Sequence, residues 1–258
     1  MPRAGRDLRV QSYDFSVNWQ RFSVFFCIFT LDLAISDMLE KTQGVVLHAL
    51  RYADDKEIVT VFTASRGAVS FMVKRPKGRG GTMVRVALMP LNLLEVDMDF
   101  REEVRLQRLV DVRVAEPYGS LPYNPMKQTI ALFLGEFLYY ALREEQASEE
   151  LFEYLRMSLL WLDNRREGFA NFPAVFLIHL SRFLGFWPDG EEAQVGLSEE
   201  ERRLVPLMLR MDFGTMHLFR FSQGQRRRLL EVLNDYYRRH VPHFPELRSM
   251  AILREVLS

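Results

Sequence analysis

The chain has 258 residues, of which 48% are hydrophobic and 26% are charged. This composition is typical of a folded protein and excludes disorder over the whole chain, and the length allows one large domain or two ordinary ones. The 34 Lys and Arg residues balance the 34 Asp and Glu residues, so net charge favours no class of partner. No apolar run reaches the roughly 18 residues that cross a bilayer, so we expect no membrane span.

The first 37 residues differ from the rest. Residues 22–35 form an apolar run that contains Asp32, behind a stretch of mixed charge. The run is a poor signal peptide, because the leading stretch is not clearly basic and no small-residue cleavage site follows. One interpretation is an extra strand or helix packed on the body. We favour another, in which the folded chain starts at Met38 and residues 1–37 are a start-site artefact.

Residues 38–117 show the period of two that is typical of β-strands. The pattern predicts strands over residues 45–50, 58–63, 68–74, 82–88, 94–100 and 104–114, with a turn at 65–67 and a bulge at Gln107-Arg108. So many short strands favour a closed barrel, because closure hides the edges that a small open sheet would expose. We predict an OB-like barrel rather than a sandwich.

After a linker at residues 118–123 the hydrophobic period becomes 3.6, which is typical of helices. The pattern predicts helices over residues 126–143, 148–163 and 173–185, two more that begin after Ser198 and Ser222, and a last one over 246–257. Asn124 with Pro125 is a helix start signal, and both serines open capping boxes. The predicted fold class is therefore α+β, with an N-terminal OB-like β-barrel over 38–117 and an all-helical C-terminal domain over 118–258.

Positive charge is concentrated in the predicted barrel. No acidic residue lies between Glu57 and Glu95, whereas this stretch contains the cations Arg66, Lys74, Arg75, Lys77, Arg79 and Arg85. The segment 74–81 reads KRPKGRGG and predicts a flexible basic loop, whose glycines let the backbone approach a ligand while its cations neutralise phosphates. These six cations are the candidate DNA-binding residues. The alternative is a solvated hairpin loop.

Two other interpretations of this region are base stacking by its aromatic residues and a nucleotide-binding role for its glycine-rich segment. Phe62 and Phe71 have the chemistry of base-stacking platforms, but apolar strand positions are usually core, which is the reading we prefer. The GRGG segment has neither the spacing nor the Lys-Ser/Thr pair of a phosphate-binding loop of nucleotide hydrolases, so ATP chemistry is unsupported.

Three carboxylates allow an enzymatic hypothesis. Period two places Glu95, Asp97 and Asp99 on one face of a strand, where they have the chemistry of a divalent metal site for phosphodiester cleavage. The opposite face is apolar, so a half-buried strand is the simpler interpretation, and we expect Arg105 and Arg113 on the next strand to pair with these carboxylates. We favour this structural interpretation and expect no metal.

Other chemistry-bearing residues give weaker signals. His240 and His243 lack a third ligand, which makes a weak metal site. The only cysteine, Cys27, excludes a disulfide framework and a cysteine zinc site within one chain, and indicates a reducing compartment. Runs of arginine in the helical half are solvated faces, an extension of a DNA track, or the rim of an apolar groove that suits an acidic tail ending in an aromatic residue. We find no catalytic constellation and expect no cofactor.

The order of these parts resembles a known family. The segments that carry the resemblance are MLEKTQGVVL at 38–47, the basic loop, LPYNP at 121–125, LFLGEFL at 132–138, FLGF at 183–186 and PELRS at 245–249. Together they resemble the bacterial RecO family of DNA repair and recombination mediators, from Met38 to Ser258. No single segment is a sharp motif; the order and the two-part architecture make the match.

The resemblance implies a protein that is not an enzyme. Members of the family bind single- and double-stranded DNA, anneal complementary strands and contact the acidic tail of single-strand-binding protein, and with their partner RecR they help to load the RecA recombinase. This implies a cytoplasmic, nucleoid-associated protein. Some members carry a cysteine zinc module in the helical half; this chain has no cysteine after Cys27, so the resemblance implies no such module here. A metal-dependent nuclease that uses the Glu95 face and an RNA-binding barrel protein stay open as alternatives.

Overall fold

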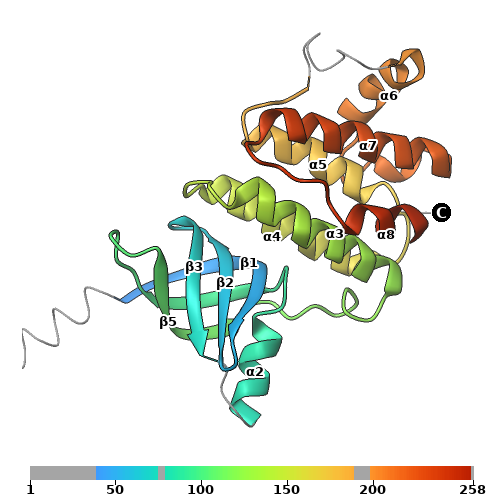
Figure 1. Ribbon diagram of the computed structural model, residues 1–258. Helices are drawn as coiled ribbons and strands as arrows, with labels where there is room; N and C mark the ends of the chain where they lie inside the picture. The colour runs from blue at the N-terminus through green and yellow to red at the C-terminus, as the bar shows by residue number, and fades with distance from the viewer. Residues whose placement is uncertain (1–38, 75–78, 189–197, 257–258) are drawn as a thin grey trace, which may run out of the picture. The chain divides into compact units, whose positions relative to one another are not determined.

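The computed structural model describes residues 39–74, 79–188 and 198–256 (Figure 1). The interpretation of residues 1–37 therefore lies outside the described residues. None of the helices in the described ranges has the length and apolar character that a membrane crossing requires.

Five strands close into a barrel, as the sequence predicts. They are β1 (Leu39–Ala53), β2 (Lys56–Thr63), β3 (Gly67–Lys74), β4 (Leu93–Asp99) and β5 (Leu106–Val114). Their order around the barrel is β1-β2-β3-β5-β4; β3 and β5 run parallel where they pair, while the β1–β2, β2–β3 and β4–β5 pairs are antiparallel. This closed five-stranded arrangement with a crossover is that of an OB-like barrel.

The predicted strand at residues 82–88 is wrong, because residues 82–87 belong to helix α2 (Arg79–Ala87) and Leu88 follows it in a turn. Figure 1 shows α2 at one end of the barrel. Val84, Ala87 and Leu88 have the i, i+3, i+4 spacing of a helix face, and they pack with barrel residues such as Phe71 and Val96. The helix thus covers the end of the barrel core with one apolar face. Its β-branched residues, which favour strands, explain why the sequence pattern predicted a strand here.

The predicted bulge in β5 lies three residues further along the chain. Asp97 pairs with Asp111 and Met98 pairs with Leu109, so Val110 is the extra residue. Gln107 is instead a buried polar residue: its side-chain oxygen accepts the Arg101 N–H at 2.8 Å, and its amide nitrogen donates to the Arg101 carbonyl at 2.7 Å. Gln107 therefore fixes the β4–β5 connection.

The second half of the chain is helical. Its helices are α3 (Pro125–Leu142), α4 (Glu149–Asn164), α5 (Phe172–Phe183), α6 (Glu199–Leu209), α7 (Gln223–His240) and α8 (Ser249–Val256), with a short 3-10 helix at Met216–Leu218. The predicted start signal at Asn124 is confirmed, because its side chain accepts the backbone N–H groups of Met126 and Lys127. The helix predicted from residue 148 begins after Ser148, whose side chain accepts the N–H of Leu151. Ser222 and Gln225 form the predicted capping box of α7. The last helix begins at Ser249, three residues later than predicted.

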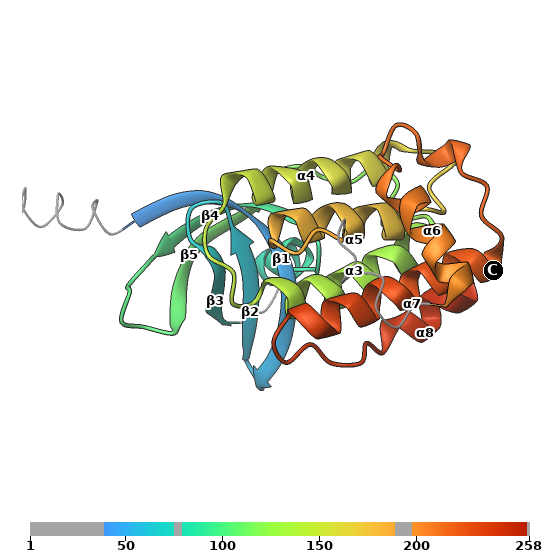
Figure 2. The ribbon, with the colours of Figure 1, turned by 90° about the horizontal axis from the view of Figure 1, so that it is seen from above.

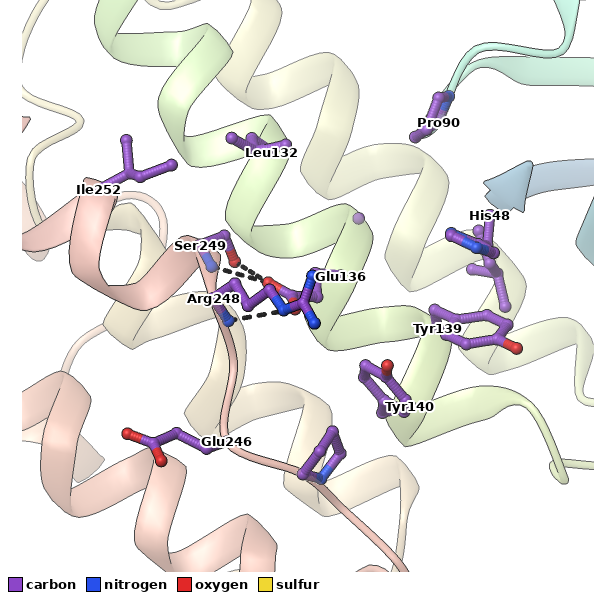
Figure 3. A pocket seen from close by; sticks show the side chains of 13 residues that line it. His48, Pro90, Leu132, Glu136, Tyr139, Tyr140, Glu246, Arg248, Ser249 and Ile252 are labelled. Carbon is purple, nitrogen blue, oxygen red and sulfur yellow. Dashed lines mark hydrogen bonds between the residues drawn. The ribbon is translucent and has the colours of Figure 1, made fainter. Parts of the chain in front are cut away.

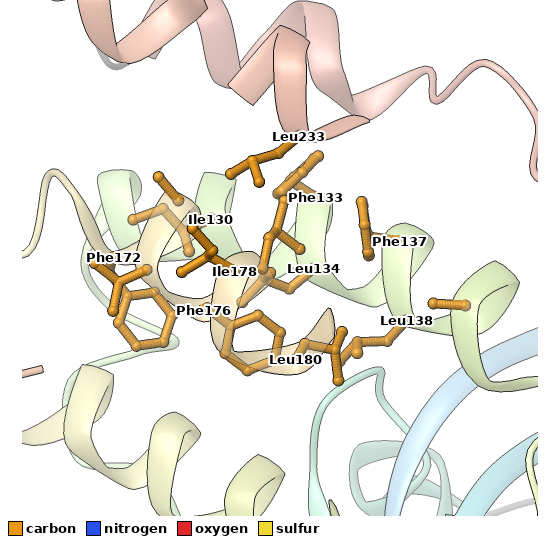
Figure 4. Packing of buried hydrophobic residues seen from close by; sticks show 14 of the residues in the cluster. Ile130, Phe133, Leu134, Phe137, Leu138, Phe172, Phe176, Ile178, Leu180 and Leu233 are labelled. Carbon is orange, nitrogen blue, oxygen red and sulfur yellow. The ribbon is translucent and has the colours of Figure 1, made fainter. Parts of the chain in front are cut away.

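The core of the helical half lies between α3, α5 and α7, which run alongside one another (Figure 2). Figure 4 shows side chains of α3, among them Phe133 and Phe137, packed against Phe176 of α5 and Leu233 of α7. The same hydrophobic cluster includes Val45, Leu47 and Phe62 of the barrel. The barrel and the helices are therefore joined by buried apolar surface.

Two hydrogen bonds to backbone carbonyls add to this connection. The N–H of Ala68 donates to the carbonyl of Glu145 at 3.1 Å, and the Tyr118 hydroxyl donates to the carbonyl of Leu91 at 2.7 Å. The neighbouring Gly67 has a φ of +70°, and a Cβ there would lie 2.3 Å from the Glu145 carbonyl oxygen. Only glycine suits this turn between β2 and β3.

Candidate nucleic-acid interface

Arg66 lies in the predicted turn between β2 and β3. Its Nε donates to Glu40 Oε2 at 2.9 Å, and its guanidinium lies 4.5 Å from the ring centroid of Phe100. Arg66 therefore pairs a carboxylate and an aromatic ring of the barrel. The charge of this candidate cation is therefore compensated within the protein.

Lys74 ends β3 and is exposed, and its Cα pairs with that of Lys56 on β2. Directly opposite residues of antiparallel strands have Cβ atoms about 5 Å apart, and like charges at such positions repel. Within the described residues no carboxylate forms an ion pair with either ammonium group. The two lysines thus present an uncompensated pair of positive charges that an anion would stabilise.

Lys56 is not among the cations predicted from the sequence, although its position immediately after the Asp54-Asp55 turn was the available signal. It also missed Tyr52, which is 64% exposed near the end of β1. Phe62 and Phe71 are fully buried, so the prediction that they are core residues is confirmed. Tyr52 is therefore an exposed aromatic side chain four residues before Lys56, and it has the chemistry of a base-stacking platform.

The structure describes only some of the other candidate cations. Arg75 and Lys77 lie outside the described residues. Arg79 begins α2, so the predicted loop 74–81 is too long: its last three residues form the first turn of this helix. Arg85 is exposed in the last turn of α2.

The carboxylates of β4 each face a cation. Arg113 lies opposite Glu95 on the neighbouring strand, and one of its guanidinium nitrogens lies 3.7 Å from Oε2 of Glu95, as predicted. The Nζ of Lys41 lies 3.5 Å from Oδ2 of Asp97, and an Nη of Arg101 lies 3.1 Å from Oδ2 of Asp99. Arg105 precedes β5 and takes no part in an ion pair within the described residues, so its predicted pairing is wrong.

These ion pairs give the β4 face a structural role. In the described ranges no three His, Cys, Asp or Glu side chains come together in a group suited to a metal ion. His240, one of the two histidines considered as weak metal ligands, donates from Nδ1 to the Tyr236 carbonyl at 2.8 Å. No observation here favours the nuclease hypothesis.

An apolar groove of about 630 Å³ lies between α3, α8 and the barrel (Figure 3). Its walls include Leu132 and Ile252, both about half exposed, and the rings of Tyr139 and Tyr140. Its charged lining residues are Glu136, Glu246 and Arg248, so the rim is not basic. The groove therefore lacks the cationic rim that would suit an acidic tail.

Glu136 explains part of this arrangement. Its carboxylate accepts the backbone N–H groups of Arg248 and Ser249, at 3.1 and 2.8 Å, and the Ser249 hydroxyl (Figure 3). A carboxylate at the N-terminus of a helix is favourable because it compensates the unpaired N–H groups there. Glu136 of α3 thus fixes the start of α8.

Another carboxylate, which is buried, fixes the linker. Asp163, at the end of α4, accepts the backbone N–H groups of Gly119, Ser120 and Leu121, at 2.8, 2.8 and 2.6 Å. Burial raises its pKa, but these hydrogen bonds together hold the pKa of Asp163 below its ordinary value. Asp163 therefore stays ionised and holds the segment that connects the barrel to the helices.

The fold and the site together define a two-part α+β protein, in which a small closed barrel with exposed cations is followed by a helical half. Residues 38–118 match the family Recombination protein O N terminal, and residues 123–192 and 189–250 match Recombination protein O C terminal. The chain therefore belongs to the RecO family of DNA repair proteins, as the resemblance indicated.

Relatives along almost the whole length agree with this assignment. The DNA repair protein RecO of Phocaeicola vulgatus is 41% identical over 241 residues, which cover 86% of this chain and 100% of that protein. Its counterpart in Bacteroides fragilis is 41% identical over 85% of this chain and 99% of its own length. In Porphyromonas gingivalis the identity is 31%, over 84% of this chain and 98% of the relative.

Proposed function

We propose that the protein is a recombination mediator that binds single- and double-stranded DNA, anneals complementary strands and, with RecR, helps to load RecA onto DNA coated by single-strand-binding protein. Membership in the RecO family supports the DNA repair role. Such a mediator breaks no covalent bond, so it needs neither a nucleophile nor ATP.

The observation that carries the DNA contact is the facing pair Lys56 and Lys74 on the barrel. A phosphate bound between them would relieve their repulsion and release counterions from the DNA. We assign the DNA contact to this pair and to Arg66, Arg75, Lys77, Arg79 and Arg85, with Tyr52 as the aromatic platform. In this scheme the contribution of Arg66 is reduced, because Glu40 already compensates its charge.

The proposed protein partners are RecR and the acidic tail of single-strand-binding protein. The apolar groove beside α8 is a poor candidate for that tail, because Arg248 is its only cation among three charged lining residues. We therefore place the tail on one of the arginine-rich helix faces, such as α7. A mediator of this kind works in the cytoplasm, associated with the nucleoid.

The test is strand annealing with DNA precoated by the organism's single-strand-binding protein. We expect annealing with the intact coating protein and a much lower rate when its acidic tail is deleted. Absence of annealing on both bare and coated DNA would contradict the proposal. Competition by RNA as strong as that by DNA would favour the RNA-binding alternative instead.

A further inference from the structure

A polar pocket of about 380 Å³ lies beside the linker, and its lining contains none of the residues to which the DNA contact is assigned. Its lining comes from the linker, the first turn of α3 and the residues that follow α4. The lining residues that matter here are Ser120, Asn124, Lys127, Asp163, Arg165 and Arg166.

The charge of this pocket is positive. Lys127, Arg165 and Arg166 contribute three cations, and Asp163 contributes the one carboxylate of the lining. The carboxylate of Asp163 already accepts three backbone N–H groups. It is therefore engaged with the linker and does not form a salt bridge with any of the three cations.

Lys127 is the buried cation of the pocket, with 1% of its surface exposed. Its Nζ donates to the hydroxyl of Ser120 at 2.6 Å and to the backbone carbonyl of Asp163 at 2.8 Å. Both acceptors are uncharged, and no ion pair joins the ammonium group to the nearby Asp163 carboxylate. Burial lowers the pKa of Lys127, and the charge of Asp163 only partly offsets this effect. A buried charge in this state is stabilised by an anion that reaches the pocket.

Arg165 and Arg166 are the exposed cations. The guanidinium of Arg165 lies 4.9 Å from the ring centroid of Trp161, which restrains its orientation. Within the described residues neither arginine forms an ion pair. Their N–H groups are consequently open to a phosphate, which guanidinium groups bind in bidentate geometry.

An exposed aromatic residue lies next to the pocket in the chain. Tyr123 immediately precedes the lining residue Asn124 and is 80% exposed. Cations that follow a phosphate backbone, together with an aromatic ring that stacks a base, are the usual elements of single-strand binding. The N-terminus of α3 adds little, because the Asn124 side chain already accepts the N–H groups of Met126 and Lys127.

We propose that this linker pocket is a second DNA contact, in which Arg165 and Arg166 bind a backbone phosphate above Lys127 and Tyr123 stacks the adjacent base. The inference rests on the proposed DNA-binding function and extends it from the barrel to the linker. A strand that occupies both contacts passes along the connection between the two halves of the chain.

The test is the salt dependence of binding to a fluorescent oligo-dT strand, measured by anisotropy. Arg165→Ala with Arg166→Ala should lower the log–log slope by about 0.7, because one phosphate contact on a single strand is lost. The matched control, Arg202→Ala with Arg203→Ala on exposed positions of α6, should keep the wild-type slope. Arg165→Lys with Arg166→Lys should also keep it, which separates charge from folding.

Tyr123 gives an independent measurement. Tyr123→Ala should weaken binding at fixed salt by about tenfold without changing the slope, whereas Tyr123→Phe should bind as the wild type does. If the wild type fails to bind oligo-dT, both the proposed function and this inference are wrong. If the wild type binds and the double alanine variant, with an unchanged melting temperature, keeps the wild-type slope, only the linker pocket is refuted. The linker pocket is also refuted if inorganic phosphate competes with oligo-dT equally well for the wild type and for the double alanine variant.

Discussion

Glu136 and Ser249 are 113 residues apart in the chain, yet the Glu136 carboxylate accepts both the backbone N–H and the hydroxyl of Ser249. The contact joins the middle of α3 to the first residue of α8. Both residues line the apolar groove, whose half-exposed Leu132 and Ile252 come from the same two helices (Figure 3). The shape of the groove therefore depends on this one carboxylate.

Replacing that carboxylate should loosen α8. Glu136→Ala leaves two backbone N–H groups and a hydroxyl without their acceptor, so we expect a loss of about 1–3 kcal/mol in the free energy of unfolding. Urea denaturation measures this loss. Glu246→Ala, at an exposed position lining the same groove, is the control and should cost less than about 0.5 kcal/mol. Equal stability of the two variants would contradict the capping role.

This contact also explains why the start of the last helix was predicted three residues too early. The local pattern around Glu246 permits a helix, but the acceptor that fixes its first turn comes from α3. The caps at Asn124, Ser148 and Ser222 were predictable, because in each case the capping side chain precedes its own helix. A cap supplied by a distant helix leaves no trace in the local sequence.

The candidate site also combines features that the local sequence predicts with features that depend on distant contacts. The alternation of apolar and polar residues predicts the barrel, and the local charge predicts its cations. The pairing of Lys56 with Lys74 depends on the register of β2 and β3, and the burial of Lys127 depends on the approach of α4 to the linker. Helix α2 was the avoidable error, since Val84, Ala87 and Leu88 already had helical spacing.

Lys56 should show opposite effects on stability and on binding. Lys56→Gln removes the repulsion with Lys74, so we expect a gain of about 0.2–1 kcal/mol in the free energy of unfolding. The same change should weaken DNA binding and reduce its salt slope by about 0.7 on single strands. Urea denaturation and anisotropy titrations measure the two effects. Weaker binding together with lower stability would indicate a folding defect and count against the phosphate contact.

His48 should make stability depend on pH. Its ring lies 4.5 Å from that of Tyr139, and burial lowers the pKa of His48, against a smaller opposing effect of the Glu136 carboxylate. Between this lowered pKa and the ordinary value of about 6.5 the unfolded chain binds more protons, so stability falls as the pH falls through that window. The melting temperature should therefore drop less between pH 7.5 and 5.0 in His48→Phe than in the wild type.

The control for this measurement is His217→Gln, because His217 is exposed on the 3-10 helix. This variant should keep the pH dependence of the wild type. If the melting temperature of the His48→Phe variant drops as much as that of the wild type, protonation of His48 does not affect the interface between β1 and α3.

The basic loop should contribute to DNA affinity through charge alone. Replacing Arg75, Lys77 and Arg79 together by Ala should lower the log–log salt slope by roughly 2 on single strands. The charge-conserving variant Arg75→Lys, Lys77→Arg, Arg79→Lys should keep the slope. If the alanine variant is folded and its slope is unchanged, the loop is only solvated, and the DNA contact lies elsewhere.

Removal of divalent metal should leave strand annealing intact. Glu95, Asp97 and Asp99 share one face of β4, but each faces a cation: Arg113, Lys41 and Arg101 respectively. An activated water or a Lewis acid serves bond cleavage, which annealing does not involve. Annealing rates with and without EDTA should therefore agree, apart from the small effect of divalent ions on DNA itself.

A double variant makes the same test independent of chelation. Asp97→Asn with Asp99→Asn should anneal as the wild type does, or bind DNA slightly more tightly, because the change removes two negative charges and frees Lys41 and Arg101 for phosphates. The measurement is annealing together with a gel assay for cleavage in magnesium. Loss of annealing under EDTA that added metal restores, matched by loss in the double variant, would assign this face a metal-dependent role. Magnesium-dependent cleavage that disappears in the double variant would establish the nuclease hypothesis in place of the mediator.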